Sequence, residues 1–230
     1  MKYLFISIYL TLMLFSQESF LNSKEIVVVE SKDCPFCQKL REDVLKDYKA
    51  SIPLRVVNKG SLQNFKLKER VRAVPTILYI QDAKEQFRHT GYLEPKEFYK
   101  ALASFTLGKD SKAYDIAYNK STESRFCKKY NEFKNAGDGV FVDKISGDIL
   151  FDTEDRFNSH SGWLSFYKAV DGAVEFKEDN SYGMHRIEVI AKKSGAHLGH
   201  VFDRSDGKKR FCINANVLKF VPRNKLKGKK

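Results

Sequence analysis

The sequence predicts two folded domains, an α/β domain followed by a mostly β domain that is barrel-like or a sandwich. A chain of 230 residues exceeds the roughly 100–150 residues of one typical domain. The first 110 residues combine β-branched runs with amphipathic helical segments, whereas the later residues form short alternating runs separated by glycine-containing turns. Thirteen glycines and five prolines exclude a collagen-like or low-complexity chain, and four cysteines are too few for a disulfide-stapled scaffold.

Residues 1–23 have the composition of a secretory signal peptide or an N-terminal membrane anchor. Lys2 is followed by an uncharged, mainly apolar run at 3–15, which is shorter than the roughly 20 residues of a membrane-spanning helix. No clear small-residue cleavage motif follows the run, so both interpretations stay open. In either case we expect the folded domains to work outside the cytoplasm, in the periplasm or as a secreted protein.

The chain is strongly basic, with 41 Lys and Arg residues against 29 Asp and Glu residues and a net charge of +12. The basic tail at 223–230 predicts a solvated, flexible end or contact with an anionic surface. No aromatic side chain is interleaved with the charges of the tail, as a single-strand binding groove requires. We therefore expect no specific nucleic-acid partner.

The predicted α/β domain covers residues 24–110. Strands are predicted at 25–30, 52–57, 77–80 and 86–93, and helices at 38–48 and 96–107. The segment at 62–70 is predicted as helix or loop. The polar residues at 107–120 then predict a short linker or the first turn of the next domain, with the boundary near residue 110.

Cys34 and Cys37 form a C-x-x-C pair between the first strand and the first helix. The free N–H groups and the dipole at a helix N-terminus stabilise a thiolate, and a second thiol one turn later can close a disulfide. A metal site or a structural bridge is the alternative, but the chain has no second C-x-x-C. This pair, together with Pro75 in a Val-Pro-Thr sequence before a later strand, resembles the thioredoxin fold. The resemblance implies a redox-active dithiol in which Cys34 attacks and Cys37 resolves, with a cis Pro75 beside it.

The mostly β domain is predicted over residues 111–222. Short runs suited to strands occur at 139–142, 148–151, 174–176, 186–190, 200–202 and 210–214. In the last run, Arg210, Cys212 and Asn214 share one face because side chains alternate along a strand. A cation on the same face favours the Cys212 thiolate, although a strand cysteine alone is also typical of an inert core position.

Four sequence blocks of this domain follow one another at suitable intervals. They are Gly-Trp-Leu-Ser-Phe at 162–166, Arg-Ile-Glu-Val at 186–189, a run with two histidines at 195–203, and Arg-Phe-Cys-Ile-Asn at 210–214. Together they resemble the type B methionine sulfoxide reductases, over about residues 122–220.

The resemblance implies that Cys212 is the nucleophile, which attacks the sulfoxide sulfur and becomes a sulfenic acid. It implies a substrate site in which Trp163 holds the methyl group and Arg210 supports the thiolate. In that site His197, His200 and Asn214 position the oxygen or supply its proton. A core position for the tryptophan and a metal-ligand pair of the two histidines are the alternatives.

Two departures from the family pattern set expectations of their own. In many members two C-x-x-C pairs hold a structural zinc ion, and the aligned positions here are Asp143, Ser146, Ala191 and Ser194. This implies a form without zinc, and we expect no cofactor. The cysteine that resolves the sulfenic acid in many members is Ser161 here. Cys127, the other thiol of this domain, is our candidate for that role, the alternative being an idle buried thiol.

The two resemblances combine into one expected reaction cycle. The Cys34–Cys37 dithiol would reduce a Cys127–Cys212 disulfide within the fused chain, at high effective concentration. The expected partners are oxidised proteins or free methionine sulfoxide as substrate and an external or membrane thiol–disulfide carrier as electron donor. Two alternatives stay open: a general thiol–disulfide oxidoreductase or isomerase, and a surface protein that binds anionic polymers through its positive charge.

Overall fold

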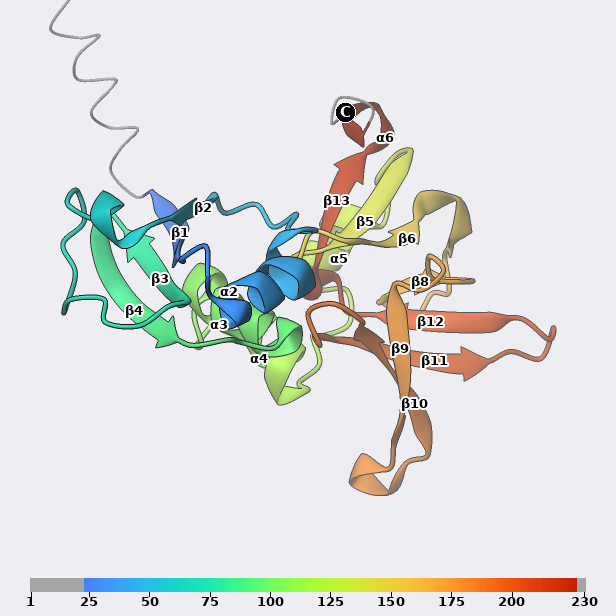
Figure 1. Cartoon of the computed structure of the whole chain (residues 1–230). Helices are drawn as coiled ribbons and strands as arrows, with labels where there is room; N and C mark the ends of the chain where they lie inside the picture. Colours follow the sequence, from blue (N-terminus) through green and yellow to red (C-terminus); the bar gives the residue numbers. More distant parts are fainter. Residues whose placement is uncertain (1–22, 227–230) are drawn as a thin grey trace, which may run out of the picture. The chain divides into compact units, whose positions relative to one another are not determined.

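The computed structural model describes residues 23–226, which divide into two compact units (Figure 1). The first unit holds the described residues up to 46 together with 52–93, and the second holds 47–51 together with the residues from 94 onward. Nearly all of the predicted signal or anchor at 1–23 lies outside the described residues. None of the helices described is long and apolar enough to span a bilayer. The compact units divide at residue 94, and the domain boundary near 110 stays a prediction.

The first unit is built on a four-stranded sheet with the order β2-β1-β3-β4. Its strands are β1 (Lys24–Val29), β2 (Leu54–Val57), β3 (Thr76–Gln81) and β4 (Lys84–Thr90). β1 is parallel to β2 and antiparallel to β3, and β3 is antiparallel to β4. The apolar side chains of β1 and β3 are buried, and Leu62 and Val71 pack against them. Two central strands with β-branched residues therefore form the core of this unit.

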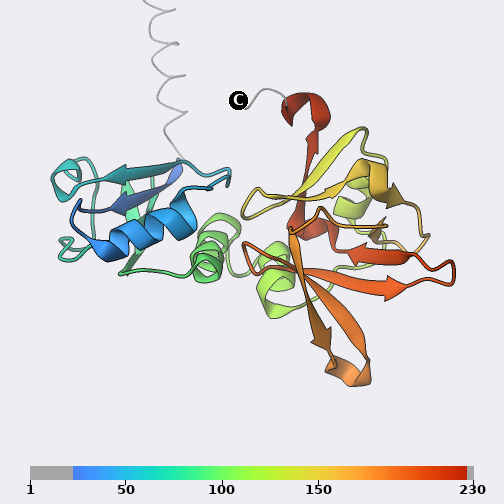
Figure 2. The ribbon, with the colours of Figure 1, turned by 45° about the vertical axis from the view of Figure 1, so that its right-hand side comes forward.

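The helix α2 (Pro35–Leu40) follows β1 and continues as a π-helical segment, Arg41–Leu45 (Figures 1 and 2). Pro35 occupies the first turn, where its missing N–H costs no helical hydrogen bond. The predicted helix is therefore present. The segment at 62–70, predicted as helix or loop, is a loop that follows a 3-10 turn at Lys59–Ser61. These elements confirm the thioredoxin-like α/β prediction.

The helices described in the second unit are α3 (Pro95–Leu107), α4 (Lys112–Asn119), α5 (Lys128–Phe133) and α6 (Arg223–Leu226). The helix α4 lies within the segment at 107–120 that the sequence predicts as a linker or a first turn. The Ser111 hydroxyl accepts a hydrogen bond from the Tyr114 N–H at 3.2 Å, and Tyr114, Ile116 and Ala117 are buried. A cap and an apolar face thus make this polar segment helical.

The strands of the second unit form two sheets, with the orders β7-β8-β12-β11-β10-β9 and β13-β5-β6. They are β5 (Gly139–Asp143), β6 (Ile149–Asp152), β7 (Arg156–Phe157), β8 (Leu164–Phe166), β9 (Val174–Asp179), β10 (Arg186–Ala191), β11 (His197–Asp203), β12 (Lys209–Ile213) and β13 (Leu218–Pro222). Short 3-10 turns lie at Thr153–Asp155, Ser181–Gly183 and Ala215–Val217. All six predicted strands are present, which confirms a mostly β domain. The sequence analysis does not predict β7, β8 or β13. β7 and β8 have only two and three residues, too few to carry an alternating pattern.

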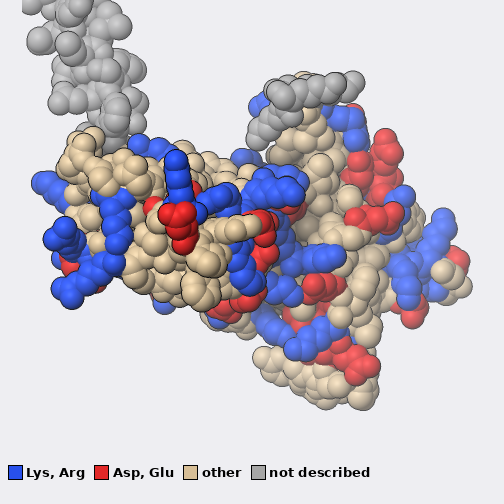
Figure 3. All heavy atoms as spheres, in the orientation of Figure 1, with Lys and Arg blue, Asp and Glu red and all other residues tan. Residues whose placement is uncertain are grey.

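Lys and Arg side chains are spread over both units on the face shown in Figure 3, where Asp and Glu are interspersed with them. The first residue of the predicted basic tail is folded against the second unit. Arg223 bonds Asp138 and Asp152, each at 2.7 Å, and begins α6. The start of the predicted flexible tail is therefore helical, and its last four residues lie outside the described part of the chain.

Candidate active sites

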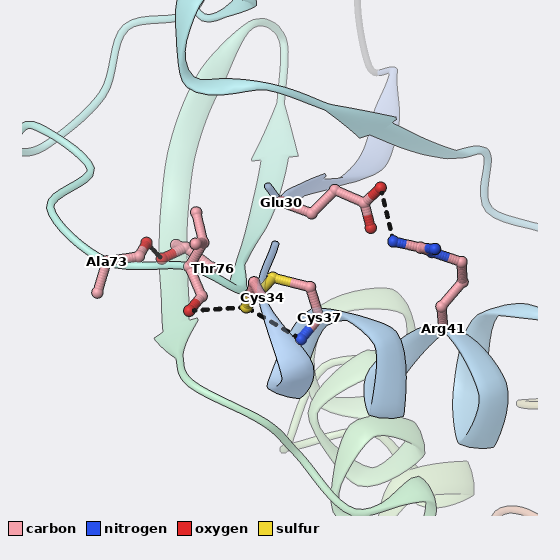
Figure 4. Close-up of a disulfide and its surroundings, with 7 residues drawn as sticks. Glu30, Cys34, Cys37, Arg41, Ala73 and Thr76 are labelled. Carbon is pink, nitrogen blue, oxygen red and sulfur yellow. Dashed lines mark hydrogen bonds and ion pairs between the residues drawn. A yellow bond between two sulfur atoms is a disulfide. The ribbon is translucent and has the colours of Figure 1, made fainter. Parts of the chain in front are cut away.

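Cys34 and Cys37 are joined by a disulfide at the N-terminus of α2 (Figure 4). The Cys34 sulfur accepts a hydrogen bond from the backbone N–H of Cys37 at 3.1 Å. Cys34 is half-buried, whereas Cys37 is only 1% exposed. Cys34 is thus the cysteine that another thiol or disulfide can reach, and the N–H groups at the helix end can stabilise its thiolate.

The loop before β3 lies against Cys34. The Val74–Pro75 peptide bond is cis, as the thioredoxin resemblance implies. The Val74 carbonyl oxygen lies 3.6 Å from the Cys34 sulfur, and the Thr76 hydroxyl donates a hydrogen bond to the Ala73 carbonyl at 2.8 Å. Pro75 lies between Val74 and Thr76 and therefore belongs to the loop beside the dithiol, of which Figure 4 shows Ala73 and Thr76.

Cys212 lies on β12, near the middle of the larger sheet of the second unit. It is paired with Ser165 of β8 on one side and with His200 of β11 on the other. Side chains of directly paired residues point to the same face of a sheet. Burial raises the pKa of the Cys212 thiol, whereas the charge of Arg210 and a hydrogen bond with Ser161 oppose that rise. Arg210 itself lies over the Phe202 ring, 5.1 Å from its centroid.

Gly199 explains how β11 can approach Cys212 so closely. A Cβ atom at Gly199 would lie 2.0 Å from the carbonyl oxygen of Cys212, so no side chain fits there. His197 and His200 flank this glycine in the chain, and the centroids of their rings lie 5.3 Å apart. The two predicted histidines are therefore brought together, next to the strand that carries Cys212.

His197 is buried and bonded to a buried carboxylate of β10. Its Nδ1 lies 2.7 Å from Oε1 of Glu188, and Oε2 of Glu188 accepts a hydrogen bond from Lys120 at 2.7 Å. Burial lowers the pKa of His197 more than Glu188 raises it. The imidazole is therefore neutral at neutral pH, with a proton on Nδ1 and an acceptor at Nε2.

His200 is held by a second carboxylate, at the end of β9. Its Nε2 lies 2.7 Å from Oδ2 of Asp179, which also accepts a hydrogen bond from Arg186 at 2.5 Å. The hydroxyl and the N–H of Ser181 donate to Oδ1 at 2.6 and 3.0 Å. The Ser181 bonds, with those from His200 and Arg186, hold the pKa of Asp179 well below its usual range. An ionised Asp179 thus makes Nε2 of His200 a donor and leaves Nδ1 to face other groups.

Trp163 follows a turn that contacts the segment leading to Cys127. The Gly162 carbonyl accepts a hydrogen bond from the Phe126 N–H at 2.9 Å, and a Cβ at Gly162 would meet Arg125 and Phe126 within 3.1 Å. The Arg125 guanidinium lies over the Trp163 ring, 5.2 Å from its centroid. Trp163 is half-buried, so part of the indole remains open, as a wall for an apolar group requires.

A buried carboxylate, Glu123, ties the Cys127 segment to the residues that follow Cys212. It accepts hydrogen bonds from the Ala215 N–H at 2.8 Å, the Asn216 N–H at 2.9 Å and the Asn216 amide at 2.7 Å. The same Asn216 amide lies 3.7 Å from the Cys127 sulfur. Cys127 and Cys212 are both free thiols, and burial raises the pKa of Cys127 as well.

Asn214 is buried, and backbone groups occupy its side chain. Its amide donates to the Leu198 carbonyl at 3.1 Å, and its oxygen accepts from the Glu123 N–H at 3.2 Å. Through these two bonds Asn214, two residues after Cys212, connects β11 to the segment that contains Glu123. The contacts favour a positioning role over direct contact with a sulfoxide oxygen.

Known family models match both domains. A SelR domain model matches residues 110–222, and a thioredoxin-like domain model matches residues 21–106. The chain joins a thioredoxin-like domain to a methionine-R-sulfoxide reductase domain. Among solved structures, the periplasmic thioredoxin SoxS from Paracoccus pantotrophus, in its reduced form, matches 36% of this chain and 94% of its own, with 18% identity and a TM-score of 0.31.

The four positions of the reductase domain that align with zinc ligands are all buried. The Ser146 hydroxyl donates to Oδ2 of Asp143 at 2.7 Å, and Ser194 also bonds this carboxylate, whereas Ala191 contributes only a methyl group. Burial raises the pKa of Asp143. One carboxylate and two hydroxyls do not match the thiolates and imidazoles of structural zinc sites. No cluster of three or more metal-binding side chains occurs in residues 23–226.

Several residues around the reductase site have no role in the sequence analysis. Glu123, Asp179 and Glu188 each bond a candidate residue or the backbone beside one, but they lie far from these partners in sequence. In the thioredoxin-like domain, Glu30 pairs with Arg41 at 3.2 Å beside the disulfide (Figure 4). Two of them have a signal in the sequence: Glu188 lies within the Arg-Ile-Glu-Val block, and Glu123 lies at the start of the region that resembles the reductase family.

Proposed function

We propose that Cys212 reduces methionine-R-sulfoxide, free or within proteins, by attack of its thiolate on the sulfoxide sulfur. The oxygen passes to Cys212 with uptake of a proton, so that the methionine sulfur gains two electrons and the cysteine sulfur loses two. The products are methionine and a cysteine sulfenic acid. The observation that carries this proposal is the pairing of Cys212 with His200 across β11 and β12, beside buried His197.

The two histidines differ in their bonds, which suggests different tasks. His200 bonds an ionised carboxylate, Asp179, which can stabilise positive charge on the ring, so we assign it the proton delivered to the sulfoxide oxygen. His197 stays neutral, and its Nε2 can accept a hydrogen bond in the part of the substrate site that takes the sulfoxide oxygen. Trp163 supplies the apolar wall for the methyl group, and Arg210 opposes the rise that burial causes in the pKa of Cys212.

Cys127 is the proposed resolving cysteine. Two connections support its proximity to Cys212: Asn216 contacts the Cys127 sulfur, and Phe126 bonds Gly162, next to the Ser161 that contacts Cys212. The Cys127 thiolate would attack the sulfenic sulfur, form a disulfide with Cys212, and release the oxygen as water after protonation. Because burial raises the pKa of Cys127, we expect this step to be faster at alkaline pH.

The thioredoxin-like domain is the proposed reductant of the Cys127–Cys212 disulfide. Cys34 would attack it, a mixed disulfide would form, and Cys37 would release the reduced reductase domain and leave a Cys34–Cys37 disulfide. An outside thiol–disulfide donor must then restore the dithiol. The basic, apolar start of the chain supports work outside the cytoplasm. We propose a metal-free reductase domain, since Asp143 and two serines satisfy one another where zinc ligands would lie.

The proposed chemistry is tested by mapping the cysteines after one turnover. Pre-reduced full-length protein is mixed with the R epimer of a blocked methionine sulfoxide, in a Cys34→Ser/Cys37→Ser background that stops the relay. We expect a Cys127–Cys212 disulfide by peptide mass spectrometry, and a dimedone adduct on Cys212 after a further Cys127→Ser change. A Cys212→Ser variant should release no methionine. Release of methionine by that variant, or oxidation confined to Cys127, would contradict the assignment.

A further inference from the structure

Three serines before and within β8 form a chain of hydroxyl groups that reaches Cys212. The Ser159 oxygen lies 2.8 Å from the Ser161 oxygen and 2.7 Å from the Ser165 oxygen. Ser165 is the residue of β8 paired with Cys212, and the Ser161 hydroxyl opposes the rise that burial causes in the pKa of the Cys212 thiol. The far end of the chain is the Trp163 carbonyl, 3.5 Å from the Ser165 hydroxyl.

Cys212 needs such a donor because of its place in the fold. It lies on a strand, so no helix N-terminus supplies N–H groups to its thiolate, as one does for Cys34. Burial opposes ionisation, and Glu123 adds a repulsive charge. The groups that favour the thiolate are the charges of Arg210 and Arg125 and the Ser161 hydroxyl. His200 is the titratable group paired with Cys212 on β11.

We propose that Ser161 donates a hydrogen bond to the Cys212 thiolate, and that Ser159 and Ser165 form a reversible hydroxyl chain behind it. This inference rests on the proposed role of Cys212 as nucleophile. It assigns Ser161 a catalytic contact with the reacting sulfur, and it makes Ser159 and Ser165 positioning residues that act through Ser161.

The chain has two arrangements because each hydroxyl has one proton and can both donate and accept. When Cys212 is a thiol, it donates to Ser161, which donates to Ser159, then to Ser165, and the chain ends on the Trp163 carbonyl. When Cys212 is a thiolate, every hydroxyl turns: Ser165 donates to Ser159, Ser159 to Ser161, and Ser161 to the sulfur. The thiolate arrangement gives up only the 3.5 Å bond to the carbonyl.

The backbone also polarises Ser161 toward the sulfur. The Trp163 N–H lies 3.4 Å from the Ser161 oxygen and donates to it. A hydroxyl that accepts hydrogen bonds becomes a better donor, and bonds in a chain strengthen one another away from bulk water. Ser165 is 1% exposed, so the Ser165 end of the hydroxyl chain is shielded from solvent. Three neutral side chains thus stabilise the thiolate without adding a titratable group.

The test is the pH dependence of Cys212 alkylation by iodoacetamide, followed in full-length protein that carries Cys34→Ser, Cys37→Ser and Cys127→Ser. Cys212 is then the single reactive thiol. We expect Ser161→Ala to raise the apparent pKa of Cys212 by about one unit, which lowers its thiolate fraction roughly tenfold at neutral pH. Ser161→Thr keeps the hydroxyl and should restore the wild-type profile. Ser159→Ala should give a smaller shift in the same direction.

An alkylation profile unchanged by Ser161→Ala would overturn the proposal. If Ser161→Ala folds poorly by circular dichroism, Ser159→Ala decides, and an unchanged profile in that variant overturns the hydroxyl chain. Alkylation needs no sulfoxide, so a raised pKa in a protein that releases no methionine would uphold this contact while the proposed reduction fails. An unshifted pKa of Cys212 in a Ser161→Ala variant that still releases methionine would uphold the proposed reduction and overturn this contact.

Discussion

Oε1 of Glu188 lies 2.7 Å from Nδ1 of His197, so that a buried carboxylate determines which nitrogen of a buried imidazole carries the proton. Lys120 bonds the other oxygen of Glu188 and links this buried pair to the protein surface. Burial opposes the ionisation of Glu188, but the bonds from Lys120 and His197 together outweigh it and lower its pKa. The result is a charged carboxylate next to a neutral histidine inside the reductase site.

The first prediction follows from this pair. Glu188→Gln keeps the size of the side chain but removes the charge that raises the pKa of His197 against burial. We expect the pKa of His197, measured by NMR titration, to fall by roughly one unit. Lys120→Ala is the matched control, because the Lys120 charge lowers the pKa of His197 and its removal should act in the opposite direction. A higher His197 pKa in Glu188→Gln would contradict the proposed balance.

The second prediction concerns Asp179 and proton delivery. Asp179→Asn removes the ionised partner of His200, so the rate of sulfoxide reduction should fall roughly 10-fold to 100-fold, measured as methionine release with excess dithiothreitol. Alkylation of Cys212 should change little. Asp206→Asn is the control, because Asp206 bonds Arg204 and backbone in the β11–β12 turn. An Asp179→Asn variant as fast as wild type would exclude this role for Asp179.

The third prediction concerns the close approach of β11 to β12. A methyl group at Gly199 would meet the Cys212 carbonyl, so Gly199→Ala should lower the free energy of unfolding by about 3 kcal/mol. It should also slow alkylation of Cys212, because the strand that carries the thiol must shift. Urea unfolding measures the first effect. Gly137→Ala, with no atom within 4 Å of the added methyl, should change neither, and equal effects of both variants would refute the explanation.

The fourth prediction concerns the buried Asp143. Burial raises its pKa above 3.8, so the folded state binds the proton more tightly than the unfolded state. Its contribution to stability is therefore present at low pH and is lost as pH rises through the raised pKa. Urea unfolding at pH 4 and pH 7 should show a larger loss of stability with rising pH in wild type than in Asp143→Asn. Parallel losses in the two proteins would mean that Asp143 does not titrate in this way.

Local patterns predict much of this structure. The strand, the C-x-x-C pair and the amphipathic segment after it place Cys34 at a helix N-terminus, and the alternating run at 210–214 gives the strand of Cys212. These patterns suffice because the period of apolar residues reports burial of one face. The helix α4 differs, since its buried face lies within a segment that is polar on average.

The partners of the site residues could not be predicted in the same way. Asp179 meets His200 because β9, β10 and β11 are adjacent in one sheet, and Glu123 reaches Asn216 across 93 positions. Such pairs depend on strand order, which the residue pattern of each strand leaves open. The serine chain likewise depends on the pairing of β8 with β12.

Reduction by Cys212 and electron transfer from the thioredoxin-like domain are tested together by counting the methionine that fully reduced protein releases without added reductant. With excess R epimer, each chain should release about two methionines, one for each pair of thiols it oxidises, and about one after Cys34→Ser/Cys37→Ser. The S epimer should yield none. One methionine from both proteins would contradict electron transfer from the thioredoxin-like domain, and none from either would contradict the role of Cys212.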